Sequence, residues 1–291
     1  LKLNTEVYGG PILNTWFDRP LGLAGKVTVR GVNVLKPETK LVNINKPLLI
    51  IPSLAIHMNR QVNEGFAINA QKDTLPLVGL VNETFKKDGY LLNLLAEELN
   101  VSATDIMGFD LGLYEIGKGM LVGANEEFIS SGRLDDMWMV YAGLKGLVDS
   151  PTTAATKMMV SLDNEETGSL TAQGAASNLH LNVVERIILA LGHDREGVHR
   201  TLANSMMISA DLAHAVHPNV GEKHDPTNRP ILGKGPVLKT AASGSYSTDS
   251  YCAAVFEGLC QEAGVPYQKF YNRSDVRGGT TIGPVTASRL N

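Results

Sequence analysis

Leu162-Asp163-Asn164-Glu165-Glu166-Thr167-Gly168-Ser169 is the stretch of this sequence that most restricts the fold. It follows an apolar run at residues 157–162, which predicts a buried strand. It precedes a segment at 171–180 that predicts the opening of a helix. Strands and helices in alternation are typical of α/β folds. Because functional sites form at the carboxyl ends of strands in such folds, the acidic loop is a candidate site.

The same alternation continues along the second half of the sequence. Apolar spacing and end signals predict helices and strands in turn. The expected elements are a helix at 135–148, a strand at 206–210, a helix at 249–263, a strand at 267–271 and a helix at 283–290. We therefore expect residues 121–291 to form an α/β domain around a mostly parallel or mixed sheet.

The first part of the chain has a different pattern, with mainly strand-type runs of residues. An alternating run at 26–30 and a continuous apolar run at 48–51 predict strands. Residues Tyr90–Leu99 then carry leucines at helical spacing, which predicts an amphipathic helix. We expect residues 1–120 to form a compact, β-rich module.

Composition narrows the function classes. The chain has 291 residues, 43% hydrophobic and 19% charged, with a formal net charge of −4. This charge offers no basic field for nucleic acid, and the apolar runs are too short to span a membrane. With only Cys252 and Cys260, the sequence indicates a reducing, cytoplasmic setting.

Residues 1–8 resemble the middle of a strand without an initiator Met, so we expect part of a longer chain.

Three carboxylate positions lie at predicted junctions. Glu165 and Glu166 follow the 157–162 run, Asp211 follows the 206–210 run, and Asp135 precedes an apolar helix. Asp135 could simply cap that helix, and acids near any helix start are favoured. Asp211 and His214, which follows it, could also be ordinary polar side chains on a loop. Taken together, the acids fit a two-metal hydrolytic site better than three unrelated caps, with zinc favoured and manganese or cobalt allowed.

Several long motifs resemble the aspartyl aminopeptidase family of dinuclear zinc exopeptidases, in the family's order and over nearly the whole chain. The motifs are Glu6-Val-Tyr-Gly-Gly-Pro-Ile-Leu-Asn-Thr-Trp-Phe-Asp-Arg19, Arg133-Leu-Asp-Asp136, Asp163-Asn-Glu-Glu-Thr-Gly-Ser169, Ser209-Ala-Asp-Leu-Ala-His-Ala-Val-His-Pro-Asn219, Lys223-His-Asp-Pro226, Gly233-Lys-Gly-Pro-Val-Leu-Lys239, Asn272-Arg-Ser-Asp275 and Gly279-Thr-Thr-Ile-Gly-Pro284. The fold that this resemblance implies is a mixed-sheet α/β/α zinc-exopeptidase domain with a β-rich dimerisation domain.

The resemblance implies a role for each matching residue. Asp135 would bridge two zinc ions, Glu166 and Asp211 would each bind one, and Glu165 would be the general base. Residues that contact the peptide substrate would be His214, Lys239 and Tyr246, together with His57, which reaches into a neighbouring subunit's site. Each of these last four residues has a structural alternative, as an ordinary core, interface or loop side chain.

The resemblance also implies dimers formed through the β-rich module, which assemble further into a dodecamer. The family's first and last zinc histidines have no counterpart in these 291 residues, so we expect a catalytic domain that is incomplete at both ends. The favoured function is a metalloaminopeptidase that removes N-terminal residues from peptides, with Asp and Glu as the candidate residues. The alternative is an inactive fragment or assembly subunit of such an enzyme that does not hold both metals.

Overall fold

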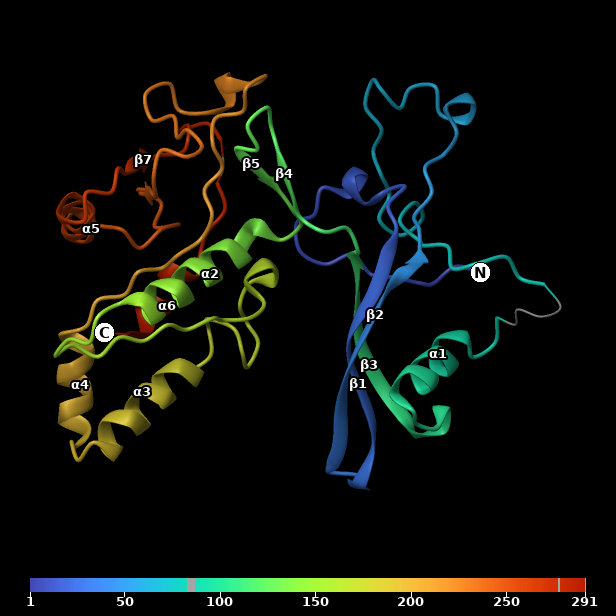
Figure 1. Cartoon of the computed structure of the whole chain (residues 1–291), viewed down its shortest axis with the longest axis horizontal. Helices are drawn as coiled ribbons and strands as arrows, with labels where there is room; N and C mark the ends of the chain where they lie inside the picture. The colour runs from blue at the N-terminus through green and yellow to red at the C-terminus, as the bar shows by residue number, and fades with distance from the viewer. Residues whose placement is uncertain (83–86, 277, 291) are drawn as a thin grey trace. The chain divides into compact units, whose positions relative to one another are not determined.

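The computed structural model describes residues 1–82, 87–276 and 278–290, and the chain divides into two compact units (Figure 1). The first unit comprises Leu1–Gly132 and the second Arg133–Asn291. The division therefore falls after Gly132, whereas the sequence placed it near residue 120. Each unit has buried side chains of its own.

A three-stranded antiparallel sheet in the order β2-β1-β3 forms the centre of the first unit. Its strands are β1 (Leu21–Asn33), β2 (Lys36–Leu49) and β3 (Ile106–Glu115). β1 and β2 form a hairpin, in which Asn33 pairs with Lys36 and the Asn33 side chain accepts a 3.0 Å hydrogen bond from the Leu35 N–H. The strands predicted at 26–30 and 48–51 are confirmed, although β2 itself ends at Leu49. The unit's other elements are η1 (Leu13–Trp16), η2 (Ile56–Met58), α1 (Tyr90–Leu99), η3 (Ala103–Asp105), β4 (Met120–Val122) and β5 (Phe128–Ser130).

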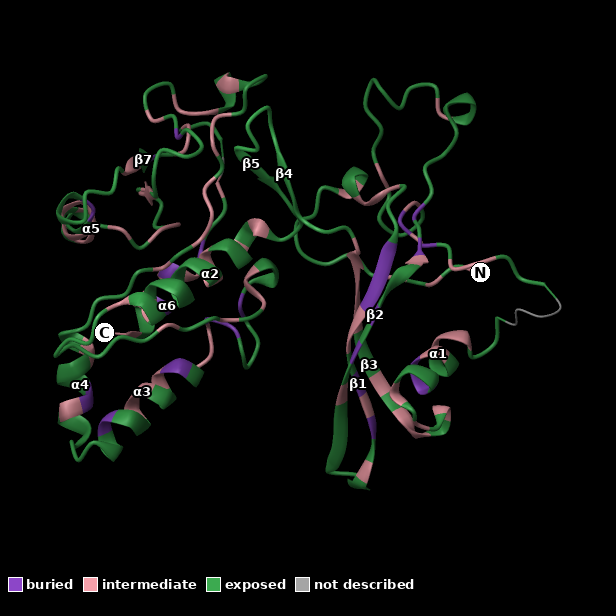
Figure 2. Cartoon of the chain, viewed as in Figure 1, coloured by how far each residue is buried: buried purple, intermediate pink, exposed green. Residues whose placement is uncertain are grey.

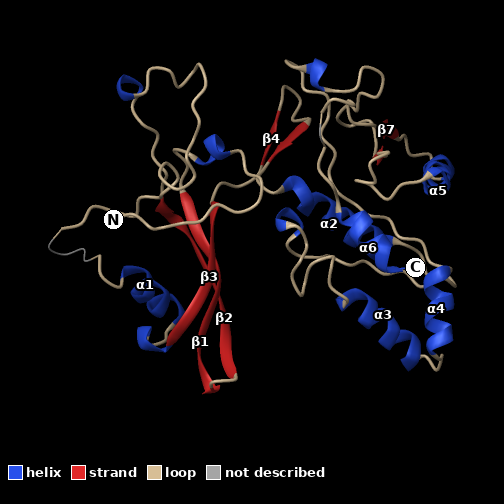
Figure 3. Cartoon of the chain, turned by 180° about the vertical axis from the view of Figure 1, so that it is seen from behind, coloured by secondary structure: helices blue, strands red, loops and turns tan. Residues whose placement is uncertain are grey.

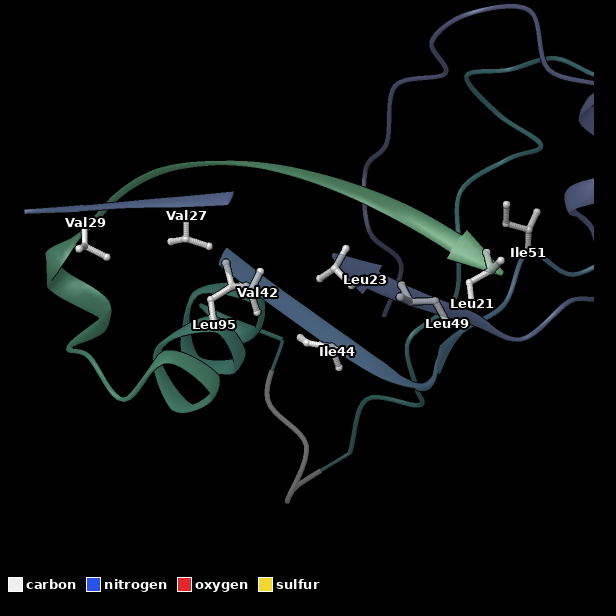
Figure 4. Packing of buried hydrophobic residues seen from close by; sticks show 9 residues of the cluster. All are labelled: Leu21, Leu23, Val27, Val29, Val42, Ile44, Leu49, Ile51 and Leu95. Atoms are coloured by element: carbon white, nitrogen blue, oxygen red, sulfur yellow. The ribbon is translucent and has the colours of Figure 1, made fainter. Parts of the chain in front are cut away.

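The hydrophobic core of the first unit lies between this sheet and α1. Alternate side chains of β1, among them Leu21, Val27 and Val29, are buried, as the period of a strand requires. Leu95 of α1 is fully buried among them (Figure 4). Figure 2 shows the same concentration of buried positions on the sheet and on α1. The leucine spacing had predicted α1 at its observed bounds, and Asn100 ends it in the left-handed conformation.

The second unit contains most of the helices, which Figure 3 shows from behind together with the strands. A parallel pair of strands, β6 and β7, is its only ladder among the described residues. The elements are α2 (Leu134–Asp149), η4 (Glu165–Thr167), α3 (Leu179–Ala190), α4 (Arg195–Ala203), η5 (Gly221–Lys223), β6 (Val237–Lys239), α5 (Ser250–Glu262), β7 (Gln268–Phe270) and α6 (Ile282–Leu290).

Four of the elements predicted in the second unit are confirmed. They are the helices at 135–148, 249–263 and 283–290 and the strand at 267–271, which correspond to α2, α5, α6 and β7. α5 begins where a local signal fixes it, because the side chain of Asp249 accepts a 2.8 Å hydrogen bond from the Cys252 N–H.

The strands predicted at 157–162 and 206–210 are wrong for the described residues. Both segments lack a ladder there, and apolar side chains such as Val160 (40% exposed) and Ile208 (60% exposed) are not buried. An apolar run predicts burial, but a strand also needs a neighbouring strand to take up its backbone hydrogen bonds. The strand expected at residues 1–8 is likewise reduced to a single bridge between Lys2 and Leu77.

The helix expected at 171–180 begins later than predicted, at Leu179. The segment before it folds back on the acidic loop, where the Ala176 N–H donates to the Ser169 carbonyl at 3.1 Å. Gly174 makes this possible, since a Cβ there would lie 2.3 Å from the Ser169 oxygen. The close approach uses backbone groups that a helix would otherwise have needed.

Among the residues that the structure describes, no helix is long and apolar enough to cross a lipid bilayer.

We predict that Leu95→Ala lowers the free energy of unfolding of the first unit by about 2–5 kcal/mol, because the substitution opens a cavity between α1 and the sheet. Urea denaturation followed by circular dichroism measures this loss. Leu92→Ala, on the same helix but 38% exposed, is the control and is expected to cost about 1 kcal/mol or less. Equal losses in the two variants would contradict this description of the core.

Candidate metal centre

Three carboxylates converge in the second unit. Asp135, Asp136 and Asp211 each offer an oxygen, and these oxygens lie within 4.8 Å of one another. Asp211 is distant in sequence from the other two, so the fold brings the group together. Carboxylate oxygens at this spacing can close on a divalent cation with small side-chain movements, since zinc–oxygen distances are about 2.0–2.2 Å.

The start of α2 places two of the three acids. Arg133 takes the helix N-cap position in the left-handed conformation (φ 56°), and Asp135 has non-helical backbone angles within the first turn. The peptide bond between Asp135 and Asp136 is cis. These extended angles are those of a residue that directly precedes a helix, so the interpretation of Asp135 as a cap stands beside that of a metal ligand. Both carboxylates lie where the helix dipole favours negative charge.

Asp211 is held by Lys239, the last residue of β6. The Lys239 ammonium donates to Asp211 Oδ2 and, at 2.6 Å, to the Leu212 carbonyl. The Leu212 N–H donates to Asp136 Oδ1 at 3.3 Å. The side chains of Lys239 and Asp211 are only 15% and 18% exposed. The backbone of Leu212, next to Asp211, thus connects β6, through Lys239, with the start of α2, through Asp136.

The partial burial of Asp136 and Asp211 and the short distances among the three carboxyl groups determine their protonation. Burial raises the pKa of Asp136 to about 8, and hydrogen bonds to Asp135 and Asp211 add to the effect. Burial also opposes ionisation of Asp211, but hydrogen bonds from Asp136 and Lys239 outweigh it and lower the pKa of Asp211. Near neutral pH, one carboxyl of the three therefore keeps a proton when no cation is bound.

The acidic loop lies within electrostatic reach of this cluster. Burial raises the pKa of Glu165, and the charges of Asp211, Glu166 and Asp135 raise it further. Asn164 shapes the loop: its backbone is left-handed (φ 60°) and its side chain accepts a 2.8 Å hydrogen bond from the Thr171 hydroxyl. Glu166 stands beside Glu165 in η4 but is not one of the three converging acids.

An aromatic group adjoins the cluster. Tyr246 has the Lys239 ammonium 5.7 Å from its ring centroid and packs edge-on against Phe270 of β7. His214 packs against the same Phe270, with ring centroids 5.3 Å apart. His214 Nδ1 also lies 3.0 Å from His224 Nε2. Lys239, Tyr246 and His214 are therefore connected through contacts around one phenylalanine.

The structure brings together most of the residues that the sequence singled out, and two that it did not. His57 lies exposed in η2 of the first unit, so its expected contribution stays a prediction. Asp136 and His224 were quoted within motifs but given no role. Adjacency to Asp135 was the only signal for Asp136. No signal in the sequence pointed to His224, because its pairing with His214 is a tertiary contact.

An acid cluster with a glutamate of raised pKa beside it is typical of metal-dependent hydrolases. Comparison with known proteins specifies the class further. All 291 residues match the family model described as aminopeptidase I zinc metalloprotease (M18), so the chain belongs to this family. The carboxylate donor set fits the zinc that the family uses, as it also fits manganese.

Two comparisons place the chain within the family. It is 59% identical to a Clostridium novyi protein described as "Probable M18 family aminopeptidase 2", over the whole chain and 67% of that protein. It is 58% identical to a protein of the same description from Clostridium acetobutylicum, and there it covers 66%. The chain thus spans about two thirds of the length of these relatives.

The structural neighbours confirm the α/β fold class. A structure described as the cryo-EM structure of the Ape4 and Nbr1 complex superposes with a TM-score of 0.90 and 36% identity, over 99% of this chain and 59% of that one. The S. cerevesiae mApe1 dodecamer superposes with a TM-score of 0.77 and 28% identity, over 99% of this chain and 64% of that one.

We predict that the metal-free protein loses stability as pH rises from about 5 to about 9. Because the pKa of Asp136 is raised on folding to about 8, the folded state holds a proton that the unfolded state releases at lower pH, and this advantage disappears as pH passes the folded value. Thermal unfolding in EDTA across this range measures it.

Asp136→Asn should flatten that pH dependence, whereas Asp149→Asn at the far end of the same helix should leave it unchanged. An unaltered pH dependence in Asp136→Asn would mean that the three acids do not share a proton.

Proposed function

We propose that this chain carries the catalytic machinery of a zinc aminopeptidase that hydrolyses the N-terminal peptide bond of peptides. The observation that carries the proposal is the convergence of Asp135, Asp136 and Asp211 beside Glu165, in a chain of the aminopeptidase I zinc metalloprotease family. A substrate carbonyl placed between these groups would meet both the cation and a proton acceptor.

The proposed metal site would hold two zinc ions. Asp135 would serve both of them, and Asp211 and Glu166 would each serve one. When bound, zinc supplies Lewis-acid polarisation of the substrate carbonyl and lowers the pKa of the attacking water. Lys239 orients Asp211 through its ion pair, and Asp136 holds the neighbouring backbone through its bond to the Leu212 N–H.

Glu165 is the proposed general base. It takes a proton from the water as the water oxygen bonds to the carbonyl carbon. It then delivers this proton to the leaving nitrogen as the carbon–nitrogen bond breaks. Its raised pKa suits both steps, because a base whose pKa lies nearer the working pH can accept and return a proton efficiently.

Three further residues are proposed to contact the substrate: His214, Lys239 and Tyr246. The proposal is supported by the packing of His214 and Tyr246 against the same Phe270 and by the ion pair of Lys239 with Asp211. His57 of a neighbouring subunit is proposed to complete the site. A preference for N-terminal Asp or Glu would rest on cationic or neutral donors of this set facing the substrate's side-chain carboxylate.

The β-rich first unit is proposed to mediate self-association, first into dimers and then into a dodecamer. One similar structure is itself described as a dodecamer. The connection between β1 and β2 also exposes apolar side chains, with Val34 96% and Leu35 91% exposed. Apolar residues gathered at a hairpin tip favour burial against a partner.

We predict that Glu165→Gln lowers kcat about 10²–10⁴-fold while zinc content stays at the wild-type level, because the amide cannot accept the water's proton. Release of p-nitroaniline from Asp-, Glu- and Leu-anilides measures turnover, and mass spectrometry of the digested protein measures zinc. Glu166→Gln is the matched contrast and should lose zinc together with activity. Wild-type turnover in Glu165→Gln would contradict its role, and a wild-type protein inactive on all three anilides would contradict the function.

We predict that Val34→Asp reduces the particle size, because a charge at the hairpin tip opposes burial against a partner. Light scattering coupled to size-exclusion chromatography measures the mass. Val148→Asp, at an exposed position of α2 (71% exposed), is the control and should keep the wild-type mass. An unchanged mass in Val34→Asp would remove the hairpin tip from the assembly surface.

A further inference from the structure

The pairing of His214 with His224 sets which nitrogen of His214 carries a proton. The two imidazoles meet at His214 Nδ1 and His224 Nε2, 3.0 Å apart, with ring planes at 67°. At such a contact one nitrogen must donate and the other must accept. The nitrogen left to His214 for any other partner is Nε2, so the direction of this hydrogen bond decides whether Nε2 donates or accepts.

The surroundings of His224 decide the direction. Its other nitrogen, Nδ1, is buried and has no hydrogen-bond partner among the residues that the structure describes. If His214 donated to His224 Nε2, a neutral His224 would carry its own proton on Nδ1. That buried N–H would then have no hydrogen-bond acceptor. If His224 donates from Nε2, only a bare nitrogen lone pair is left at Nδ1. Orphaned buried donors are rarer than under-satisfied acceptors, which favours the second arrangement.

His224 is also held firmly enough to impose this choice. It ends η5, where its N–H donates to the Gly221 carbonyl at 3.2 Å. Arg229 donates to the same carbonyl at 2.9 Å, and Arg273 donates to the Glu222 carbonyl. The turn that carries His224 is thus tied to two other segments of the unit.

Burial favours the neutral form of His214, the form in which the tautomer matters. It lowers the pKa of His214, and the positive charge of Lys239 lowers it further. A neutral imidazole carries one proton, so its position on Nδ1 or Nε2 determines what the ring offers to a substrate.

We propose that His224 is a positioning residue, which donates from Nε2 to His214 Nδ1 and so fixes the His214 proton on Nε2. His214 then presents a hydrogen-bond donor, suited to the substrate carbonyl oxygen and to the negative charge that develops on it during hydrolysis. This inference rests on the proposed function for the identity of the substrate. The contact between the two rings stands independently of it.

Kinetics of the zinc-loaded protein separate hydrogen bonding from ring packing. His224→Phe keeps a ring against His214 but removes the donor, and should lower kcat about 10- to 100-fold with KM and zinc content little changed. His224→Gln returns an N–H near the same place and should recover most of the lost kcat. His199→Phe, at an exposed histidine of α4, is the control and should behave as wild type.

Wild-type kcat in His224→Phe would overturn the proposal, and so would an equal loss in His224→Phe and His224→Gln. If the wild-type protein hydrolyses none of the anilides, the proposed function fails, but the tautomer remains testable by neutron diffraction from deuterium-exchanged crystals. We expect deuterium on Nε2 of both rings. Deuterium on His214 Nδ1 would overturn the proposal whatever the protein's activity.

Discussion

The structure of the second unit depends on the repulsion among three carboxylates. Asp135, Asp136 and Asp211 place their oxygens within 4.8 Å of one another, and like charges at this distance cannot all stay ionised without a counter-charge. The chain itself provides two partial remedies. Lys239 pairs with Asp211, and Asp136 keeps a proton to a pKa of about 8. A divalent cation would neutralise the charge of all three carboxylates, and this is why we interpret the cluster as a metal site.

This constraint also explains how the neighbouring elements are arranged. Lys239 must end β6 close to Asp211, and the parallel pairing of β6 with β7 fixes that position. The same strand β7 carries Phe270, against which His214 and Tyr246 pack. His214 and Tyr246 thus pack on β7, the strand that pairs with the one carrying Lys239. The residues proposed to bind metal and those proposed to contact the substrate share this pair of strands.

Local signals in the sequence predicted α1, α2, α5 and α6, whereas α3 begins later than expected and α4 was not predicted. The leucine spacing of α1 and the Asp249 cap of α5 act within a few residues, so both helices appear where they were expected. The strands predicted at 157–162 and 206–210 are absent from the described residues, because a strand depends on partners that lie elsewhere in the chain. The acids were found at junctions of predicted elements. Asp136 and His224 were not, since their importance arises from contacts across 76 and 10 residues of sequence.

Asp135 and Asp211 of this cluster, together with Glu166, are proposed to hold the zinc of this family member. Anomalous diffraction at the zinc absorption edge, from crystals of the zinc-loaded protein, tests this central claim most directly. The account predicts two peaks beside the acid cluster, with Asp135 contacting both and Asp211 contacting one. Zinc peaks elsewhere in the second unit, with none at Asp135 and Asp211, would contradict it.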